Sequence, residues 1–236
     1  MIRYIGGKTR LARKIFNKIK EYVKEQNFSS YKEPFFGGGS MSQFSAALNI
    51  SRFCSDNKED LILFYKELQK GWLPPKEISE DLYSSLKNEK PSPLRGYAGF
   101  ACSFGGKWFG GYARDKTKRR NLINESYVRV VKSLPYIKDI YFKCSDYLSI
   151  PIEQGTLVYC DPPYKGVLGY GGKFNHDLFW ETCRTWSKRG AAVFVSEYEA
   201  PKDMVTIAEW SYKTYIHHAA TKNYKVERLF TPNVTF

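Results

Sequence analysis

The sequence predicts an α/β fold: a mostly parallel sheet that is interrupted by a mostly helical insert. Strand-like runs alternate with helical segments before residue 74 and after residue 138, and this alternation is typical of parallel strands joined by right-handed crossovers. Between those positions, helical pieces flank a stretch rich in glycine, aromatic and basic residues. We therefore expect one domain formed by residues 1–73 and 139–236, with residues 74–138 inserted between its two halves.

Four elements are expected in the first half of the domain. Residues 9–26 carry apolar side chains at helical spacing with lysines between them, which predicts an amphipathic helix. Residues 31–36 and 52–56 are short β-prone runs and predict two strands. A further helix is expected at residues 58–70, before Gly71 and a pair of prolines end this half.

The insert and the second half follow from the same patterns. Helices are expected at residues 76–87 and 120–134 of the insert. After the insert, the patterns predict strands at residues 140–144, 156–160 and 192–196, a helix at residues 177–189, and two or three strands near the end of the chain.

Composition and charge limit the classes of protein to which the chain belongs. Lysine and arginine exceed aspartate and glutamate by 37 to 24, so the formal charge is +13 and a polyanionic partner is expected; the alternative is a basic surface that binds nothing. No apolar run is long enough to span a membrane, and the first residues lack the apolar core of a secretion signal. Five scattered cysteines without a Cys-x-x-Cys pair, and only three histidines, predict a cytoplasmic protein with reduced thiols and no metal site.

The most informative motif is Asp161-Pro162-Pro163-Tyr164, which directly follows the apolar run at residues 156–160. The prolines prevent that run from continuing as a central strand, so the motif forms a rigid turn at the carboxyl end of a strand, where open α/β sheets bind ligands. The turn offers a carboxylate, a proline carbonyl and an aromatic ring. These groups suit a planar amino group on a heterocycle, because two oxygens accept its hydrogens and the ring stacks on the heterocycle. The alternative is an ordinary turn without a ligand.

Two further features fall at the ends of earlier strands. Glu33-Pro34-Phe35-Phe36 leads into the turn Gly37-Gly38-Gly39-Ser40, whose glycines allow the backbone to approach a ligand closely. This turn lacks the Lys-Ser/Thr pair of a phosphate loop and the full Gly-x-Gly-x-x-Gly of a dinucleotide site. Asp56 ends the next strand, where an acidic side chain typically accepts hydrogen bonds from ribose hydroxyls; capping of the following helix is the alternative.

Together these features resemble the N6-adenine DNA methyltransferases related to Dam, including their phage-encoded members. The resemblance covers most of the chain and rests on Tyr4-Ile5-Gly6-Gly7-Lys8, the Glu33–Gly39 turn, Asp56, Asp146-Tyr147 and Asp161–Tyr164, in the order of the family. It implies a Rossmann-like methyltransferase sheet with a target-recognition insert and S-adenosylmethionine as cofactor. The implied cofactor-binding residues are Tyr4, Gly7, Lys8, Phe35, Gly37, Gly39, Ser40, Asp56, Asp146, Tyr147 and Asp161.

The resemblance also implies how the catalytic residues Asp161, Pro162, Pro163 and Tyr164 act. The exocyclic nitrogen of adenine is a poor nucleophile because its lone pair is delocalised into the ring. Hydrogen bonds to the Asp161 carboxylate and the Pro162 carbonyl localise this lone pair for in-line attack on the sulfonium methyl group, with no covalent enzyme intermediate. The base must leave the duplex for this attack, and Tyr164 is expected to stack on it.

The residues of the turn distinguish neighbouring chemistries. Methylation of a cytosine ring carbon needs a cysteine nucleophile, usually within Pro-Cys, and the chain has no such dipeptide. Enzymes that methylate the exocyclic amine of cytosine more often begin the turn with Ser, and protein-glutamine methyltransferases begin it with Asn. Asp161 therefore favours adenine without excluding the others.

The basic stretch at residues 100–120 is the expected contact surface for double-stranded DNA. The residues expected to contact DNA are Lys107, Trp108, Tyr112, Arg114, Lys116, Lys118, Arg119 and Arg120. Basic groups are expected to bind phosphates, while aromatic or mobile loop groups fill the gap that the flipped base leaves; a solvated basic loop is the alternative. The Arg-Tyr-Asn…Phe-Asn-Val-Pro stretch with which bacterial Dam enzymes read GATC is not present, so GATC specificity is not carried over.

The sequence thus predicts a monomeric, cytoplasmic DNA (adenine-N6) methyltransferase, located in a bacterial host cell if a phage encodes it. Three alternatives stay open: adenine in RNA as the acceptor, the N4 amine of cytosine as the acceptor, and a non-catalytic DNA-binding protein on the same scaffold. A restriction partner, evasion of host defence and regulation are the roles compatible with the predicted activity.

Overall fold

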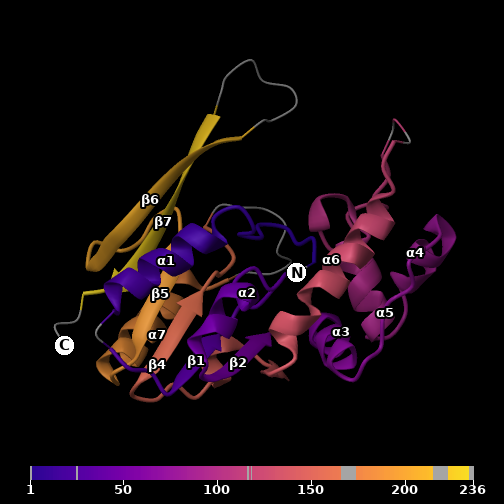
Figure 1. Cartoon of the computed structure of the whole chain (residues 1–236). Coiled ribbons are helices and arrows are strands. Elements are labelled where there is room, and N and C mark those ends of the chain that lie inside the picture. The colour runs from indigo at the N-terminus through magenta and orange to yellow at the C-terminus, as the bar shows by residue number, and fades with distance from the viewer. Residues whose placement is uncertain are drawn as a thin grey trace.

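The structure, a computed structural model, describes residues 2–24, 26–115, 117, 119–165, 174–214 and 223–233. Within these residues seven strands form one sheet in the order β3-β2-β1-β4-β5-β7-β6 (Figure 1). The strands are β1 (Ser30–Glu33), β2 (Ser51–Asp56), β3 (Ile140–Cys144), β4 (Thr156–Cys160), β5 (Ala192–Glu197), β6 (Met204–Thr214) and β7 (Asn223–Pro232). From β3 to β5 all neighbours are parallel, whereas β7 pairs antiparallel with both β5 and β6. The mostly parallel α/β sheet is confirmed.

The strand order reverses between β1 and β4. In the centre of the sheet, Ser30 of β1 is in register with Ser51 of β2 on one side and with Thr156 of β4 on the other. Crossovers leave such a pair of strands in opposite directions, so a crevice opens at their carboxyl ends. The glycine turn follows β1 and the Asp161–Tyr164 turn follows β4, so the fold brings both motifs to this crevice.

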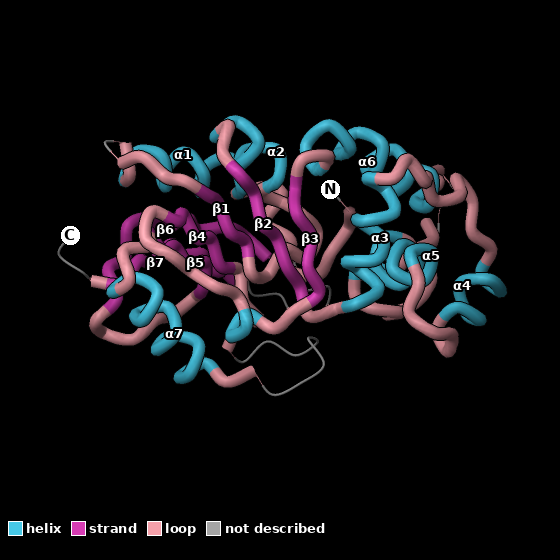
Figure 2. Tube along the Cα trace, turned by 90° about the horizontal axis from the view of Figure 1, so that it is seen from below, coloured by secondary structure: helices cyan, strands magenta, loops and turns pink. Residues whose placement is uncertain are grey.

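Helices cover both faces of the sheet (Figure 2). α1 and α2 lie on one face and α7 on the other; their bounds are α1 (Ala12–Tyr22), α2 (Ser42–Ser45) and α7 (His176–Lys188). Leu157 and Tyr159 of β4 belong to the buried cluster that contains the α1 side chains, and Val158 and Cys160 to the cluster of α7. All of β4 is buried because the sheet is covered on both sides. Among the helices of the described residues, none has the length and apolar character needed to span a bilayer.

The insert packs against α3 (Glu59–Gln69), beside the sheet. Its helical elements are α4 (Glu80–Leu86), α5 (Pro93–Gly96), the π-helical turn η2 (Tyr97–Ala101), η3 (Phe104–Gly106) and α6 (Leu122–Ile137). Tyr97 and Val130 of the insert share one buried cluster with Phe64 of α3 and with the α1 face of the sheet. In this cluster the insert has no hydrophobic core separate from that of the sheet. The domain boundaries at residues 74 and 138 therefore stay a prediction from the sequence.

Two helices of the insert begin or end differently from the sequence prediction. α4 begins at Glu80 because the Ser79 hydroxyl accepts a hydrogen bond from the Leu82 amide at 3.1 Å and caps the helix. α6 continues through Pro135 to Ile137. Its last carbonyls receive side-chain donors from the sheet domain, since Arg52 donates to Tyr136 at 2.8 Å and Gln69 donates to Ile137 at 2.7 Å.

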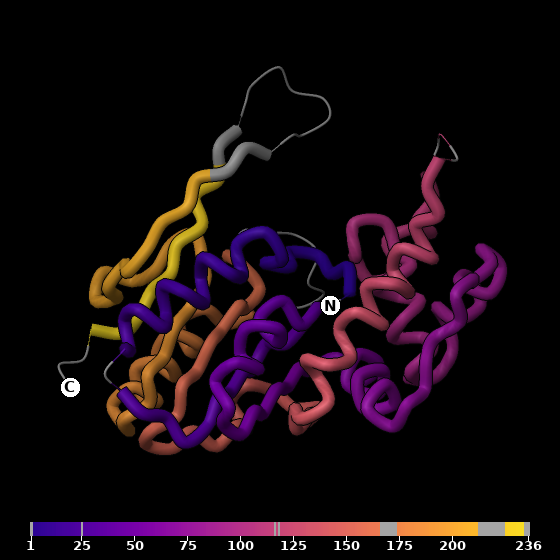
Figure 3. Tube along the Cα trace, viewed as in Figure 1, coloured from indigo at the N-terminus to yellow at the C-terminus, as the bar shows by residue number. Residues whose placement is uncertain are grey.

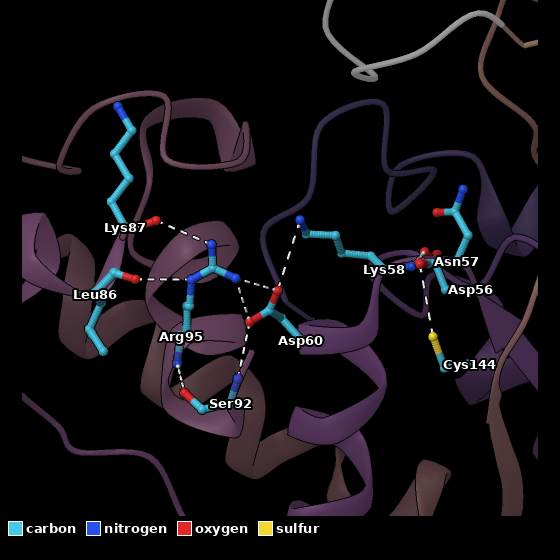
Figure 4. Close-up of polar contacts among 9 residues, drawn as sticks. All are labelled: Asp56, Asn57, Lys58, Asp60, Leu86, Lys87, Ser92, Arg95 and Cys144. Carbon is cyan, nitrogen blue, oxygen red and sulfur yellow. Dashed lines mark hydrogen bonds and ion pairs between the residues drawn. The ribbon is translucent and has the colours of Figure 1, made fainter. Parts of the chain in front are cut away.

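A buried ion pair anchors the insert to α3 (Figure 4). Both carboxylate oxygens of Asp60 accept from Arg95 of α5, at 3.0 and 2.8 Å, and one of them also accepts from the Ser92 amide at 3.1 Å. The exposed fractions of the two charged side chains are 3% for Asp60 and 14% for Arg95. The remaining guanidinium nitrogens donate to the carbonyls of Leu86 and Lys87. One arginine thus connects α3 with the ends of two insert helices.

We predict that Asp60→Ala lowers the free energy of unfolding by about 3–5 kcal/mol, because removal of one partner leaves a mostly buried charge uncompensated. Urea denaturation measures the loss. Glu67→Ala on the same helix is the matched control, since the Glu67–Lys70 ion pair is exposed and is expected to contribute less than about 1 kcal/mol. Equal effects of the two substitutions would contradict the anchoring role of Asp60.

Candidate active site

A cavity of about 460 Å³ lies at the carboxyl ends of β1, β2, β3 and β4. Its volume falls within the range of roughly 300–1,000 Å³ that is typical of small-molecule sites. The N-terminal segment, four strand ends and the insert all contribute to its wall. The predicted cofactor ligands that line it are Tyr4, Gly7, Lys8, Phe35, Gly37, Ser40, Asp56, Asp146, Tyr147 and Asp161. Gly39 is outside the lining; its φ of 71° and its place against the Phe36 ring shape the turn.

The N-terminal segment lies between the sheet and the insert (Figure 3) and contacts both. The Ile2 amide donates to the Gly38 carbonyl at 3.2 Å, and the Ile5 amide donates to the Gly106 carbonyl at 3.0 Å. A Cβ on Gly38 would lie 2.7 Å from the Tyr4 Cβ, and a Cβ on Gly106 would lie 2.5 Å from the Tyr4 nitrogen. Glycine is therefore required at both contacts for Tyr4 to reach the cavity.

Asp56 lies at the end of β2 and is 8% exposed. One carboxylate oxygen accepts from the Gly37 amide at 3.0 Å, and the other accepts from the Lys58 amide at 3.0 Å, just before α3. Burial raises the pKa of Asp56, while these backbone hydrogen bonds oppose the rise. The carboxylate thus joins the glycine turn to the start of α3 and still borders the cavity. Its position is therefore compatible with both alternatives drawn from the sequence, which are binding of ribose hydroxyls and capping of the following helix.

Aromatic rings and one serine complete this end of the cavity. The rings of Phe35 and Tyr147 lie 5.4 Å apart, and Phe174 packs against both. The exposed Asp146 accepts from the Leu148 amide at 2.9 Å and precedes the short helix η4 (Tyr147–Ser149). Ser145 is a residue that sequence reasoning missed: its Oγ is buried in the cavity wall and has no hydrogen-bond partner among the described residues.

The Asp161–Tyr164 turn is held by Lys8. The Lys8 Nζ lies 2.8 Å from Oδ1 of Asp161 and 3.9 Å from Oε1 of Glu227. It also lies 4.4 Å from the centroid of the Tyr164 ring, whose hydroxyl donates to Glu227. Burial raises the pKa of Asp161, and the Lys8 ammonium opposes this rise. Pro163 borders the cavity, and Tyr164 is only 7% exposed.

Three buried glutamates surround this turn, and none of them is among the residues predicted individually as catalytic, cofactor-binding or DNA-binding. Glu33, Glu197 and Glu227 are at most 2% exposed. Burial raises the pKa of Glu197 and of Glu227 to about 7, and it raises the pKa of Glu33 well above its usual value. Glu33 is the first residue of the glycine motif, and the motif residues that follow it are a sequence signal that could have identified it as a site residue. Glu227 has no such signal, because β7 carries no motif.

The residues predicted to contact DNA separate into two groups. Lys107, Arg114, Arg119 and Arg120 are exposed, and two of them form surface ion pairs: Arg114 with Glu80 and Arg120 with Glu125. Lys116 and Lys118 lie outside the described residues.

The aromatic members of that set point inward. Trp108 lines the cavity, with its ring 4.7 Å from Phe100 and 3.9 Å from the Lys58 Nζ. The Tyr112 hydroxyl donates to the Ile78 carbonyl at 2.6 Å. Phe104 is instead the outward-facing ring of this loop, with 70% of its surface exposed.

Within the described residues, no group of three or more His, Cys, Asp or Glu side chains is arranged to hold a metal ion.

Solved structures of several methyltransferases are similar to this chain. A candidate methyltransferase from Escherichia coli is 10% identical, with a TM-score of 0.43 over 100% of this chain and 92% of that chain. A candidate methylase from Haemophilus influenzae is 12% identical, with a TM-score of 0.41 over 94% and 96%. Magnesium protoporphyrin IX methyltransferase from Synechocystis PCC 6803, with bound SAM, is 9% identical, with a TM-score of 0.40 over 95% and 80%. No curated protein sequence matches the chain.

The sequence itself matches a family model. The match is to the D12 class N6 adenine-specific DNA methyltransferase and spans residues 4–131, more than half of the chain. These residues include the N-terminal segment, the glycine turn, Asp56 and most of the insert. The chain therefore belongs to the D12 class N6 adenine-specific DNA methyltransferase family.

Proposed function

We propose that the protein transfers a methyl group from S-adenosylmethionine to N6 of an adenine flipped out of duplex DNA. The observation that carries the proposal is the position of Asp161. Its carboxylate follows β4 and borders the same cavity as Asp56 and Asp146. An acceptor for the hydrogens of the amine and the proposed cofactor ligands thus face one space, as direct transfer between two bound molecules requires.

The chemistry of the cavity residues fits S-adenosylmethionine. Asp56 has lone pairs beyond those used by Gly37 and Lys58, and they suit ribose hydroxyls. Phe35 and Tyr147 offer apolar surface for the adenine of the cofactor, and Ser145 offers a hydrogen bond that nothing in the described residues uses. When bound, this cofactor supplies an electrophilic methyl group on a sulfonium sulfur.

On the acceptor side, we assign the amine hydrogens to the Asp161 carboxylate and the Pro162 carbonyl. Both lie in the turn after β4, which the Lys8 contact fixes. Stacking of the base on Tyr164 requires a further step, since the Lys8 ammonium lies over that ring. The ammonium must shift off the ring before a base covers the same face, while it stays paired with Asp161 and Glu227.

DNA is assigned to the side of the molecule on which the exposed loop of the insert lies. The hairpin of β6 and β7 and residues 111–115 of the insert extend to the same side (Figure 1). Lys107 and Arg119 of the insert are exposed, and the surface ion pairs of Arg114 and Arg120 are weak enough to exchange for phosphates. The cytoplasmic location, the phage origin, the restriction partner and the monomeric state stay predictions from the sequence.

Phe104 is the side chain that we assign to the gap left by the flipped base. The Phe104 amide donates to the Gly111 carbonyl at 2.8 Å, and Ser103 bridges to Tyr112, so the loop that carries the ring is fixed. Two residues further on, Gly106 touches the N-terminal segment. An exposed ring on a fixed loop next to the site suits insertion into a base stack.

We predict that Asp161→Ala lowers kcat on DNA by about 10²–10³-fold, because the transition state loses its main hydrogen-bond acceptor. DNA affinity is expected to change less than about twofold, since the basic loop is unaffected. Transfer of label from S-adenosylmethionine and fluorescence anisotropy of labelled DNA measure the two quantities. The control is Asp203→Ala, a surface acid paired with Arg184. Wild-type turnover in Asp161→Ala would refute the assignment.

We predict that Phe104→Ala lowers kcat/KM on matched duplex DNA by about tenfold, because the open stack loses its filler. The loss is expected to shrink when the target adenine faces an abasic site, where flipping costs less. Tyr141→Ala, an exposed ring on β3 with 62% exposure, serves as control. An equal loss on both duplexes would show that Phe104 acts outside base flipping.

A further inference from the structure

We propose that Glu227, on β7, is a positioning residue for the catalytic turn. It holds Tyr164 and shares the Lys8 ammonium with Asp161. The side chains of Lys8, Asp161 and Glu227 therefore carry a net charge of −1 together during methyl transfer. The inference rests on the proposed function and adds a residue to it. Glu227 belongs to none of the motifs from which the site was predicted, and it lies outside the matched residues 4–131.

The fold brings Glu227 to the turn through an antiparallel pairing. β7 lies beside β5, with Arg228 in register with Glu197 at the carboxyl end of β5. The preceding residue, Glu227, is 1% exposed and accepts a hydrogen bond from the Tyr164 hydroxyl. The same oxygen, Oε1, lies 3.9 Å from the Lys8 Nζ. The ammonium, itself 8% exposed, therefore lies between two carboxylates, with Asp161 the nearer at 2.8 Å.

The charge of this group matters because the acceptor nitrogen becomes positive. The nitrogen forms a bond to the methyl carbon while the carbon–sulfur bond breaks with its electron pair on sulfur, so the positive charge passes from sulfur to nitrogen. One N–H proton then leaves to the Asp161 carboxylate. Without Glu227, the Lys8 ammonium repels this cationic nitrogen and cancels the negative charge of Asp161. With Glu227 ionised the group of three carries −1, and with Glu227 protonated it carries zero. In a water-poor site such a difference changes the barrier strongly.

The groups that face Glu227 come from four parts of the chain. They are Lys8 before α1, Asp161 and Tyr164 after β4, Glu197 on β5 and Lys225 on β7. Burial raises the pKa of Glu227 to about 7, Lys8 and the Tyr164 hydrogen bond oppose this rise, and Asp161 adds to it. Ionisation of Glu227 therefore takes place close to neutral pH.

Glu197 has a similar pKa but different partners. Its two oxygens accept the backbone amides of Tyr198 at 2.7 Å and of Lys165 at 3.3 Å. Because its hydrogen bonds are to backbone amides, a change of Glu197 to glutamine keeps an acceptor and leaves the Lys8 contacts of Asp161 and Glu227 in place. It is therefore the variant that identifies which glutamate a pH profile reports.

The test measures kcat at saturating DNA and S-adenosylmethionine between pH 5.5 and 8.5. We expect the wild-type kcat to rise with pH through a midpoint near 7, since the ionised form of Glu227 is the active one. Glu227→Gln keeps the acceptor for Tyr164 but not the charge; its kcat at pH 8 is expected to fall at least about tenfold, with little change in KM and no rise near pH 7. Glu227→Asp is expected to restore part of the kcat and the rise, and Glu197→Gln to keep the rise.

Glu209→Gln on β6 is the matched control, because Glu209 pairs with Arg228 at the surface with 54% exposure; its kcat is expected to stay within twofold of wild type. A Glu227→Gln variant with wild-type kcat and a wild-type pH profile overturns the inference. So does a wild-type kcat that is constant from pH 6 to 8, a result that needs no variant to fold. A wild type that methylates no DNA at any pH instead refutes the proposed function.

Discussion

The ion pair between the buried Lys8 and the partly buried Asp161 is the contact on which the geometry of the site depends. It joins the N-terminal segment, which precedes the sheet, to the turn that follows β4 in the centre of the sheet. The same segment hydrogen-bonds to the glycine turn after β1 and to Gly106 of the insert. A single strip of chain thus positions the proposed cofactor pocket, the proposed amine acceptor and the loop assigned to DNA. Movement of this strip would disturb all three together.

Charge is divided sharply between the surface and the cavity. The chain carries +13 overall, and exposed lysines and arginines of the insert contribute to it. The cavity has the opposite character, since Asp56, Asp146 and Asp161 line it together with two lysines, Lys8 and Lys58; the pKa of the fourth lining acid, Glu33, is raised well above its usual value by burial. A basic exterior suits a polyanionic acceptor, whereas an acidic interior suits a sulfonium cofactor and an amine that becomes cationic. DNA binding and methyl transfer therefore need electrostatic potentials of opposite sign, and the fold places one at the surface and the other in the cavity.

Local patterns were sufficient to predict the sheet and the two turns. Short apolar runs followed by glycine or proline fix where β1 and β4 end, and parallel order then brings the glycine turn and Asp161 to one edge. The direction of side chains in the insert needed tertiary structure. Trp108 and Phe104 are four residues apart in one loop, yet Trp108 lines the cavity and Phe104 faces solvent. Glu227 was beyond sequence reasoning because its position depends on β7 pairing antiparallel beside β5.

The most direct test of the account identifies the methylated product. Purified protein is incubated with labelled S-adenosylmethionine and, in parallel, with unmethylated genomic DNA, RNA and protein, and the digested products are read by mass spectrometry. The account predicts N6-methyladenine from DNA and no comparable label elsewhere. Label that appears instead in cytosine, in RNA or in protein, or that appears in none of the substrates, would contradict it.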